Sequence, residues 1–251
     1  MKDNAMHEYF GEKGLLSSNL SSYEYRIYQE EMSNLIWDMI ENNRPGRLAI
    51  EASTGLGKTF ASLVPVMLWV KNYRKKALFL TATITLQEQL IRKDLPGLMK
   101  IMNLDLSYGN LKGRNNYVCR RLANNLFSQG YLSFNDSGEV SSKVFSWICE
   151  TDTGDLAELS LPSDHPVLPT IASSFHKCSG QHCPYREACF YNQKLKDARE
   201  WDIVISNYHL FFSFLLKGKG GLPFSPDIII FDEAHKMVDA ARKASSVEDS
   251  L

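Results

Sequence analysis

The sequence lacks a long apolar run and an excess of charge of either sign. Its longest apolar stretch runs from Leu63 to Val70 and contains Pro65, whereas a membrane-spanning helix needs about 20 apolar residues. The N-terminal residues do not form a secretion signal. These absences predict a soluble, cytoplasmic protein without a membrane partner. Since 28 basic and 29 acidic residues leave a net charge of −1, any nucleic acid would have to bind at local basic patches.

Internal repeats and low-complexity tracts are also absent, and cysteine is scarce. The five cysteines are an odd number, which favours a reducing compartment and a metal site over a disulfide framework. Apolar residues make up 44% of the 251-residue chain. That length and composition suit one large α/β domain, or one lobe with an inserted module.

Short apolar runs alternate with helical patterns in two parts of the chain. We expect a polar leader over residues 1–24 and a lobe made of residues 25–106 and 199–251, interrupted by an insertion over residues 107–198. The expected strands are residues 47–51, 77–80, 202–205 and 227–231, and the expected helices begin near residues 28, 58, 86 and 209. This alternation predicts a parallel sheet covered on both faces, with ligands at the carboxyl ends of its strands.

A glycine-rich loop follows the first expected strand and precedes a helix. It consists of Ser53, Thr54, Gly55, Leu56, Gly57, Lys58 and Thr59. Backbone N–H groups of such a loop bind nucleotide phosphates. Lys58 would reach the β- and γ-phosphates, and the Thr59 hydroxyl would ligate Mg²⁺. The alternative is a chance glycine-rich turn.

Two carboxylates follow the last expected strand. Asp232 would hold Mg²⁺ beside the phosphate loop, and Glu233 would polarise the attacking water. His235 would couple the nucleotide state to neighbouring segments. Alternatively, both acids only cap a helix N-terminus.

Four of the five cysteines have the pattern of a metal site. Three lie within twelve residues, and one stands 59 positions further upstream; the four are Cys119, Cys178, Cys183 and Cys189. Four thiolates suit a [4Fe–4S] cluster, while zinc could use the same thiols or include His176 or His182. Cys149 lies in an apolar, helix-like stretch and is expected to be buried and inert.

Taken together, these motifs resemble the DinG-type iron–sulfur DNA helicases of superfamily 2. Ala52 replaces the first glycine of the strict phosphate-loop pattern, as in superfamily 2, and residues 232–235 resemble its Asp-Glu-Ala-His box. The cysteine spacing resembles that of DinG rather than XPD. The resemblance covers essentially the whole chain. It implies a RecA-like P-loop lobe split by a mostly helical iron–sulfur insertion, with ATP, Mg²⁺ and a [4Fe–4S] cluster as cofactors.

Three further segments resemble helicase motifs in the expected order. Gln29 resembles an adenine contact, residues 81–90 a segment that touches the nucleic-acid backbone, and residues 206–209 the segment before the acidic box. Each could equally be a helix cap or a core polar network.

Residues 112–121 are a candidate surface for single-stranded DNA. The segment holds Lys112, Arg114, Arg120 and Arg121, with Tyr117 available for stacking, and no acidic residue. The basic run Lys71 to Lys76 is better interpreted as the end of a surface helix.

By resemblance, the chain belongs to a motor that moves 5′ to 3′ on single-stranded DNA at the expense of ATP. The second RecA-like lobe of such motors is expected to be missing, because the chain stops sixteen residues after His235. Two alternatives remain open: an ATP- and DNA-binding module without unwinding activity, and a non-helicase P-loop ATPase with a structural zinc site. The oligomeric state is not predicted.

Overall fold

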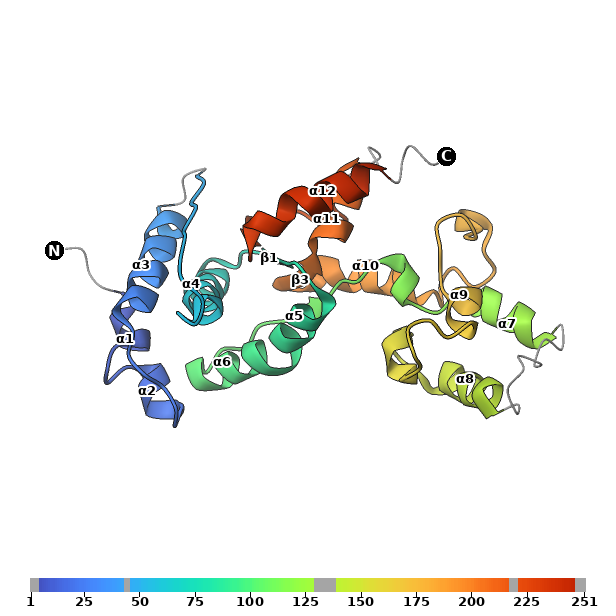
Figure 1. Cartoon of the computed structure of the whole chain (residues 1–251), viewed down its shortest axis with the longest axis horizontal. Coiled ribbons are helices and arrows are strands. Elements are labelled where there is room, and N and C mark those ends of the chain that lie inside the picture. Colours follow the sequence, from blue (N-terminus) through green and yellow to red (C-terminus); the bar gives the residue numbers. More distant parts are fainter. Residues whose placement is uncertain (1–4, 43–45, 129–138, 217–220, 247–251) are drawn as a thin grey trace. The chain divides into compact units, whose positions relative to one another are not determined.

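The computed structural model describes residues 5–42, 46–128, 139–216 and 221–246 (Figure 1). The chain divides into two compact units. We call residues 1–110 with 200–251 the sheet unit, and residues 111–199 the insertion unit. In the part of the chain that is described, no helix combines the length and apolar character needed to cross a bilayer.

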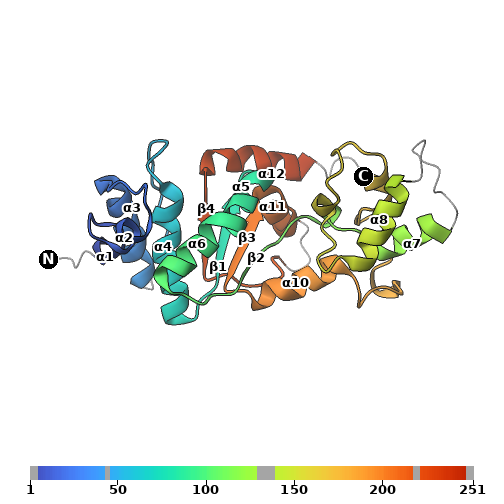
Figure 2. The ribbon, with the colours of Figure 1, turned by 90° about the horizontal axis from the view of Figure 1, so that it is seen from below.

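The sheet unit is built on four parallel strands in the order β2-β3-β1-β4 (Figure 2). The strands are β1 (Ala77–Thr81), β2 (Tyr108–Asn110), β3 (Ile203–Asn207) and β4 (Ile228–Phe231). The predicted α/β fold with a parallel sheet is therefore confirmed. All five residues of β1 are buried; since alternate residues point to opposite faces, both faces of this central strand are covered.

The strand predicted at residues 47–51 is wrong. Those residues pair with no strand in the described sheet, and Leu48 is 40% exposed. The two edges of β1 are occupied by β3 and β4, and no described strand lies beside the outer edge of β4. The sequence Asn-Asn-Arg-Pro-Gly at residues 42–46 also predicts a break after the first expected helix; residues 43–45 of this segment lie outside the described residues.

The edge strands also differ from expectation. β4, expected like the rest of the sheet to be covered on both faces, is half-buried along its length; it is an edge strand flanked only by β1. The short strand β2 was not predicted, since its three residues, Tyr-Gly-Asn, show no apolar pattern. It forms because Asp202 and Ser107 hold the two segments in register, with Ser107 N–H donating to Asp202 Oδ2 at 2.8 Å.

Helices cover the sheet and supply most of its core. They are α3 (Ile27–Glu41), α4 (Lys58–Tyr73), α5 (Ile84–Gln89), the π-helix η1 (Leu90–Asp94), α6 (Leu95–Met102), α11 (Tyr208–Leu216), the 3₁₀ turn η5 (Ala234–Lys236) and α12 (Met237–Ser246). α3 packs on α4, and both α5 and α11 pack against β1 and β3. Leu63, Met67 and Phe79 lie in the resulting core.

Residues 5–24, expected to belong to a polar leader, form two short helices, α1 (His7–Phe10) and α2 (Leu15–Asn19). Met6, Phe10 and Leu16 are almost completely buried in the core of the sheet unit. His7 Nδ1 lies 3.0 Å from Glu30 Oε1 on α3. The segment is therefore part of the folded lobe.

The insertion unit is mostly helical and has a separate core. It contains η2 (Arg114–Asn116), α7 (Arg120–Ser128), α8 (Glu139–Glu150), η3 (Leu156–Leu159), α9 (Val167–Ile171), η4 (Gly180–His182) and α10 (Phe190–Glu200), which ends at the first residue of the returning sheet unit. Tyr117, Val144 and Ile171 are buried at its centre. Isolated bridges join Tyr117 to Asp155 and Val118 to Ala172, which tie the start of the unit to its middle.

Candidate functional site

The glycine-rich loop turns sharply just before α4. Gly55 and Gly57 have φ values of 81° and 86°, a left-handed conformation that glycine adopts without steric cost. Gly57 is the N-cap of α4, and Lys58 is the first residue of that helix. Ser53, Thr54 and Gly55 are exposed, while Leu56 and Thr59 are half-buried. The first N–H groups of α4 therefore stand at the loop, where an anion would meet them.

Two side chains at the start of α3 donate hydrogen bonds to the backbone of the glycine-rich loop. The Gln29 side-chain amide donates to the Gly57 carbonyl oxygen at 2.9 Å, and the Arg26 guanidinium donates to the Gly55 carbonyl oxygen. Gln29 is only 5% exposed. The helicase resemblance predicts that Gln29 contacts adenine. In the structure, its amide nitrogen donates a hydrogen bond to the loop backbone. Arg26 was not predicted, although it stands three residues before Gln29.

The loop and the acidic box meet through one ion pair. Lys58 Nζ lies 3.3 Å from Glu233 Oε1, and it also donates to the Ala52 carbonyl oxygen at 3.3 Å. The two side chains are 27% and 30% exposed, so the pair is accessible from solvent. Folding therefore brings together two motifs that are far apart in the sequence.

Asp232 stands immediately beyond β4. Burial, and then the neighbouring Glu233 charge, raise the pKa of its carboxyl, while Lys58 opposes the shift. Its backbone N–H donates to Leu80 on β1 at 2.9 Å, and its carbonyl accepts a 2.5 Å hydrogen bond from the Tyr208 hydroxyl. A carboxylate whose charge is poorly solvated gains from a cation beside it, which suits the proposed magnesium contact. His235 Nδ1 lies 3.4 Å from Glu233 Oε2.

The polar residues of the weaker motifs partly act as helix caps. Thr83 is the N-cap of α5, and its hydroxyl accepts from Leu86 N–H at 3.3 Å. Asn207 Oδ1 accepts from Leu210 N–H at 2.9 Å at the start of α11. Gln87 is buried, and within the described residues its side-chain amide has no hydrogen-bond partner. The capping interpretation therefore accounts for two of these positions.

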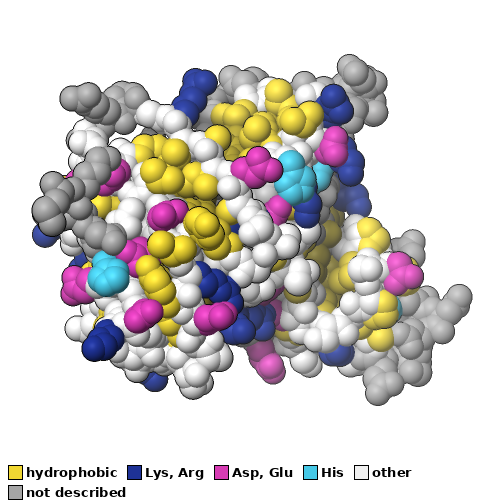
Figure 3. Space-filling model, turned by 60° about the vertical axis from the view of Figure 1, so that its left-hand side comes forward, with side chains coloured by type: hydrophobic (Ala, Val, Ile, Leu, Met, Phe, Trp, Pro, Cys, Tyr) yellow, Lys and Arg dark blue, Asp and Glu magenta, His cyan; other side chains and the backbone are white. Residues whose placement is uncertain are grey.

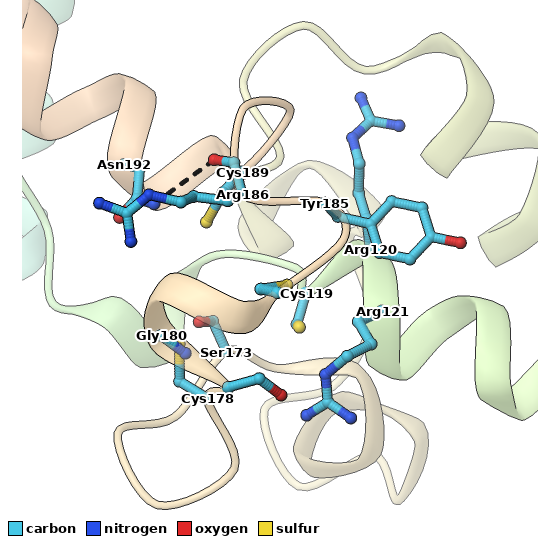
Figure 4. A pocket seen from close by; sticks show the side chains of 12 residues that line it. Cys119, Arg120, Arg121, Ser173, Cys178, Gly180, Tyr185, Arg186, Cys189 and Asn192 are labelled. Carbon is cyan, nitrogen blue, oxygen red and sulfur yellow. Dashed lines mark hydrogen bonds between the residues drawn. The ribbon is translucent and has the colours of Figure 1, made fainter.

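In the insertion unit, four cysteines line one cavity (Figure 4). Cys119 stands just before α7 and Cys189 just before α10; Cys178 and Cys183 flank η4. The described residues that line the cavity include Arg120, Arg121 and Arg186 but no carboxylate. Thiolates surrounded by cations are the donor set expected for an anionic cluster.

The four thiols share this cavity without forming a finished coordination site. Within the described ranges, no three His, Cys, Asp or Glu side chains are close enough together to hold a metal ion. Their sulfur atoms would have to turn toward a common centre. His176 and His182 are not among the cavity's lining residues, and the His176 ring packs edge-on against Phe175 instead.

Cys149 is exposed, so the prediction that it is buried is wrong. It lies on α8 directly after Ile148, which faces the core. The apolar pattern located the helix correctly, but the cysteine falls on its outer side. It does not line the cavity of the other four cysteines.

The predicted basic patch is partly used inside the insertion unit. Lys112 is 4% exposed, and its Nζ lies 2.6 Å from Asp155 Oδ2; it is therefore withdrawn from any DNA surface. The Arg114 guanidinium stacks 4.4 Å from the centre of the Tyr191 ring and donates to Cys178 Sγ at 3.2 Å.

The two other arginines of the patch donate hydrogen bonds to the backbone of residues 177–189, which we call the cysteine loop. Arg120 Nε donates to the Ala188 carbonyl oxygen at 3.1 Å, and Arg121 donates to the Lys177 carbonyl oxygen. Elsewhere, basic and acidic side chains are interspersed over the face seen in Figure 3, in keeping with the near-zero net charge.

Two family models match the chain. The family described as "Type III restriction enzyme, res subunit" matches residues 22–126, and DEAD_2 matches residues 105–250, more than half of the sequence.

Curated relatives are similar over nearly the whole chain. The ATP-dependent DNA helicase YoaA of Haemophilus influenzae is 36% identical over 95% of this chain and 37% of its own length. The 3'-5' exonuclease DinG of Bacillus subtilis is 31% identical over 92% of the chain and 24% of its own length. The ATP-dependent DNA helicase DinG of Escherichia coli K12 is 26% identical over 91% of this chain and 34% of its own length.

These relatives confirm the resemblance to DinG-type helicases. The chain spans about a third of the length of the two helicases and a quarter of the exonuclease.

Proposed function

The chain belongs to the DEAD_2 family, and we propose that it carries the ATP- and Mg²⁺-binding part of a DinG-type ATP-dependent DNA helicase. The observation that carries the proposal is the ion pair of 3.3 Å between Lys58 Nζ and Glu233 Oε1. The pair places a cation that can bind a phosphate group next to a carboxylate that can activate a water molecule. Phosphoryl transfer to water needs both groups within reach of the terminal phosphate.

Each side chain of the site has a separate task. Lys58 binds the β- and γ-phosphates, and N–H groups of residues 53–59 contact their remaining oxygen atoms. Thr59 and Asp232 would hold Mg²⁺, which neutralises phosphate charge when bound. Glu233 orients the attacking water and accepts its proton. Gln29 sets the position of the loop through Gly57, in addition to any contact with the base.

We further propose that Cys119, Cys178, Cys183 and Cys189 hold a [4Fe–4S] cluster. The shared cavity and the arginines around it support this assignment, since a thiolate-bound cluster carries negative charge. Zinc is the competing occupant. The cluster would join Cys119, at the start of α7, to the loop that precedes α10, and so fix the shape of the insertion unit.

Single-stranded DNA is the proposed polymer partner. Arg120 and Arg121 stand beside the cysteine cavity, and their guanidinium groups each retain donors beyond the loop carbonyls that they already bind. Phosphate contacts at this position would link DNA binding mechanically to the cluster.

The decisive experiment is calorimetric titration of the 251-residue chain with Mg·ATP. Lys58→Ala should lower the affinity about tenfold or more, because a charge-assisted contact contributes roughly 1.5–3 kcal/mol. Lys71→Ala is the matched control: Lys71 lies on the same helix but contacts the Asp105 carbonyl, so its affinity should equal that of the wild type. Equal affinities in all three proteins would contradict the assignment of the phosphate loop.

Turnover is tested separately. ATP hydrolysis by the purified chain, measured with and without single-stranded DNA, should disappear in Glu233→Gln, which retains the fold but loses the proton acceptor. Hydrolysis that persists in Glu233→Gln would contradict the role of Glu233.

A further inference from the structure

Glu233 has a backbone conformation that is unusual for its position. Its φ is 57° and its ψ is 50°, the left-handed region that non-glycine residues avoid. The described chain contains three other such residues, Arg74, Asn103 and Ser160. All three end helices, where this conformation is common. Glu233 instead precedes the turn η5, so the ordinary explanation does not apply to it.

The peptide group that sets this conformation is held on its carbonyl side by Tyr208. The φ of Glu233 depends on the plane of the peptide that joins it to Asp232. The oxygen atom of that peptide accepts a 2.5 Å hydrogen bond from the Tyr208 hydroxyl. The N–H of Asp232 is fixed as well, by its 2.9 Å bond to Leu80 on β1. The chain is therefore anchored on both sides of Asp232.

Tyr208 is itself rigidly placed. It is 1% exposed, and its ring stacks on Phe231, with centres 6.1 Å apart and planes inclined by 11°.

We propose that Tyr208 is a positioning residue that holds Glu233 in the left-handed conformation and so keeps its carboxylate beside Lys58. This inference rests on the proposed function, because it assigns to Glu233 and Lys58 a shared role at the nucleotide phosphates. Tyr208 lies inside the segment 206–209, at the start of α11. It therefore connects that segment to the hydrolytic residues through one hydrogen bond.

The position of Glu233 should affect the affinity for a nucleotide that is not hydrolysed. Glu233 shares Lys58 with the phosphates and repels their negative charge. Removing its charge by Glu233→Gln should strengthen binding of a non-hydrolysable ATP analogue by up to about fivefold, the range for a partly exposed ion pair. Tyr208→Phe retains the buried ring but frees the peptide. Glu233 then leaves the strained conformation, and the affinity should rise in the same direction.

The test is a double-mutant cycle measured calorimetrically with the magnesium complex of the imidodiphosphate analogue of ATP. Tyr208→Phe should strengthen binding in the wild-type background and have no effect when Glu233→Gln is already present. Tyr23→Phe is the matched control, because Tyr23 also donates a 2.5 Å phenol-to-carbonyl bond, to Phe10 in the same unit. It should leave the affinity unchanged in both backgrounds.

An unchanged affinity in Tyr208→Phe, or an equal change in both backgrounds, overturns the role of Tyr208. The same titrations on Lys58→Ala separate this result from a failure of the proposed function. If Lys58→Ala binds the analogue as tightly as the wild type does, the phosphate-loop assignment fails. If binding depends on Lys58 while the cycle is additive, only the inference about Tyr208 is wrong.

Discussion

The side-chain amide of Gln29 donates a 2.9 Å hydrogen bond to the carbonyl oxygen of Gly57. A Cβ atom on Gly57 would lie 2.2 Å from the amide nitrogen of Gln29, so the Gln29 amide can occupy its present position only beside a glycine. Gln29, which the helicase resemblance predicts to contact adenine, thus stabilises the backbone of the phosphate loop in the structure.

Gln29→Ala should therefore weaken the binding of all ligands that occupy the loop, whether or not they carry a base. We expect the affinities for Mg·ATP and for magnesium tripolyphosphate to fall by similar factors, up to about tenfold, the effect of one net hydrogen bond. Calorimetry with both ligands is the measurement. A contact with adenine alone would weaken ATP binding and leave tripolyphosphate binding unchanged.

Glu233→Gly should be more stable than Glu233→Ala by about 1 kcal/mol, because glycine adopts the left-handed conformation without the clash that a Cβ atom causes. The free energy of unfolding, measured by urea titration, gives the comparison. The same pair of substitutions at Lys236, the last residue of η5, should have the opposite order, since glycine is costly where φ is negative. Equal stabilities at position 233 would argue against backbone strain there.

Serine at Cys119, Cys178, Cys183 or Cys189 should abolish the visible absorption of protein purified without oxygen, and should remove its iron and sulfide. Cys149→Ser is the control and should leave absorption and metal content intact, because Cys149 does not line the cavity. Colourless wild-type protein with one zinc ion per chain would contradict the iron–sulfur assignment and favour a structural zinc site.

Replacing Arg120 and Arg121 by alanine should weaken single-stranded DNA binding and reduce its salt dependence. The slope of log affinity against log salt should fall by up to about one unit for each lost phosphate contact. Arg242→Ala, which removes an exposed pair with Asp239 on α12 in the sheet unit, should bind DNA as the wild type does. An unchanged slope in the double variant would show that the two arginines serve the cysteine loop alone.

Glu158 should make the stability of the insertion unit depend on pH. Burial would raise the pKa of its carboxyl, but hydrogen bonds from Thr153, Trp147 and Thr151 outweigh this effect and lower the pKa. A lowered pKa stabilises the fold above the unfolded value of about 4.3, and that contribution is lost as pH falls.

Glu158→Gln should therefore be less stable than the wild type at pH 7 and should approach it below about pH 4. The difference should be small, because the side chain is exposed. Thermal unfolding at several pH values measures it, with Glu150→Gln as the control. A constant difference across the pH range would contradict the hydrogen-bonding interpretation.

The sequence by itself determined the features that depend on contiguous residues. The helix that begins at Lys58, the strand that ends at Phe231 and the spacing of Cys178, Cys183 and Cys189 could all be recognised locally. Their order along the chain predicted the parallel sheet and the family. Local patterns carry this information because helix and strand periodicities repeat within a few residues.

Tertiary structure decided which of these segments contact one another and which polar side chains are buried in contacts within the protein. Leu48 lies outside the described sheet, and Lys112 is buried against Asp155. The hydrogen bond from Tyr208 to Asp232 has no signature in the spacing of the two residues. Strand order, burial and long-range hydrogen bonds depend on competition between distant segments for the same neighbours, and a local pattern does not encode that competition.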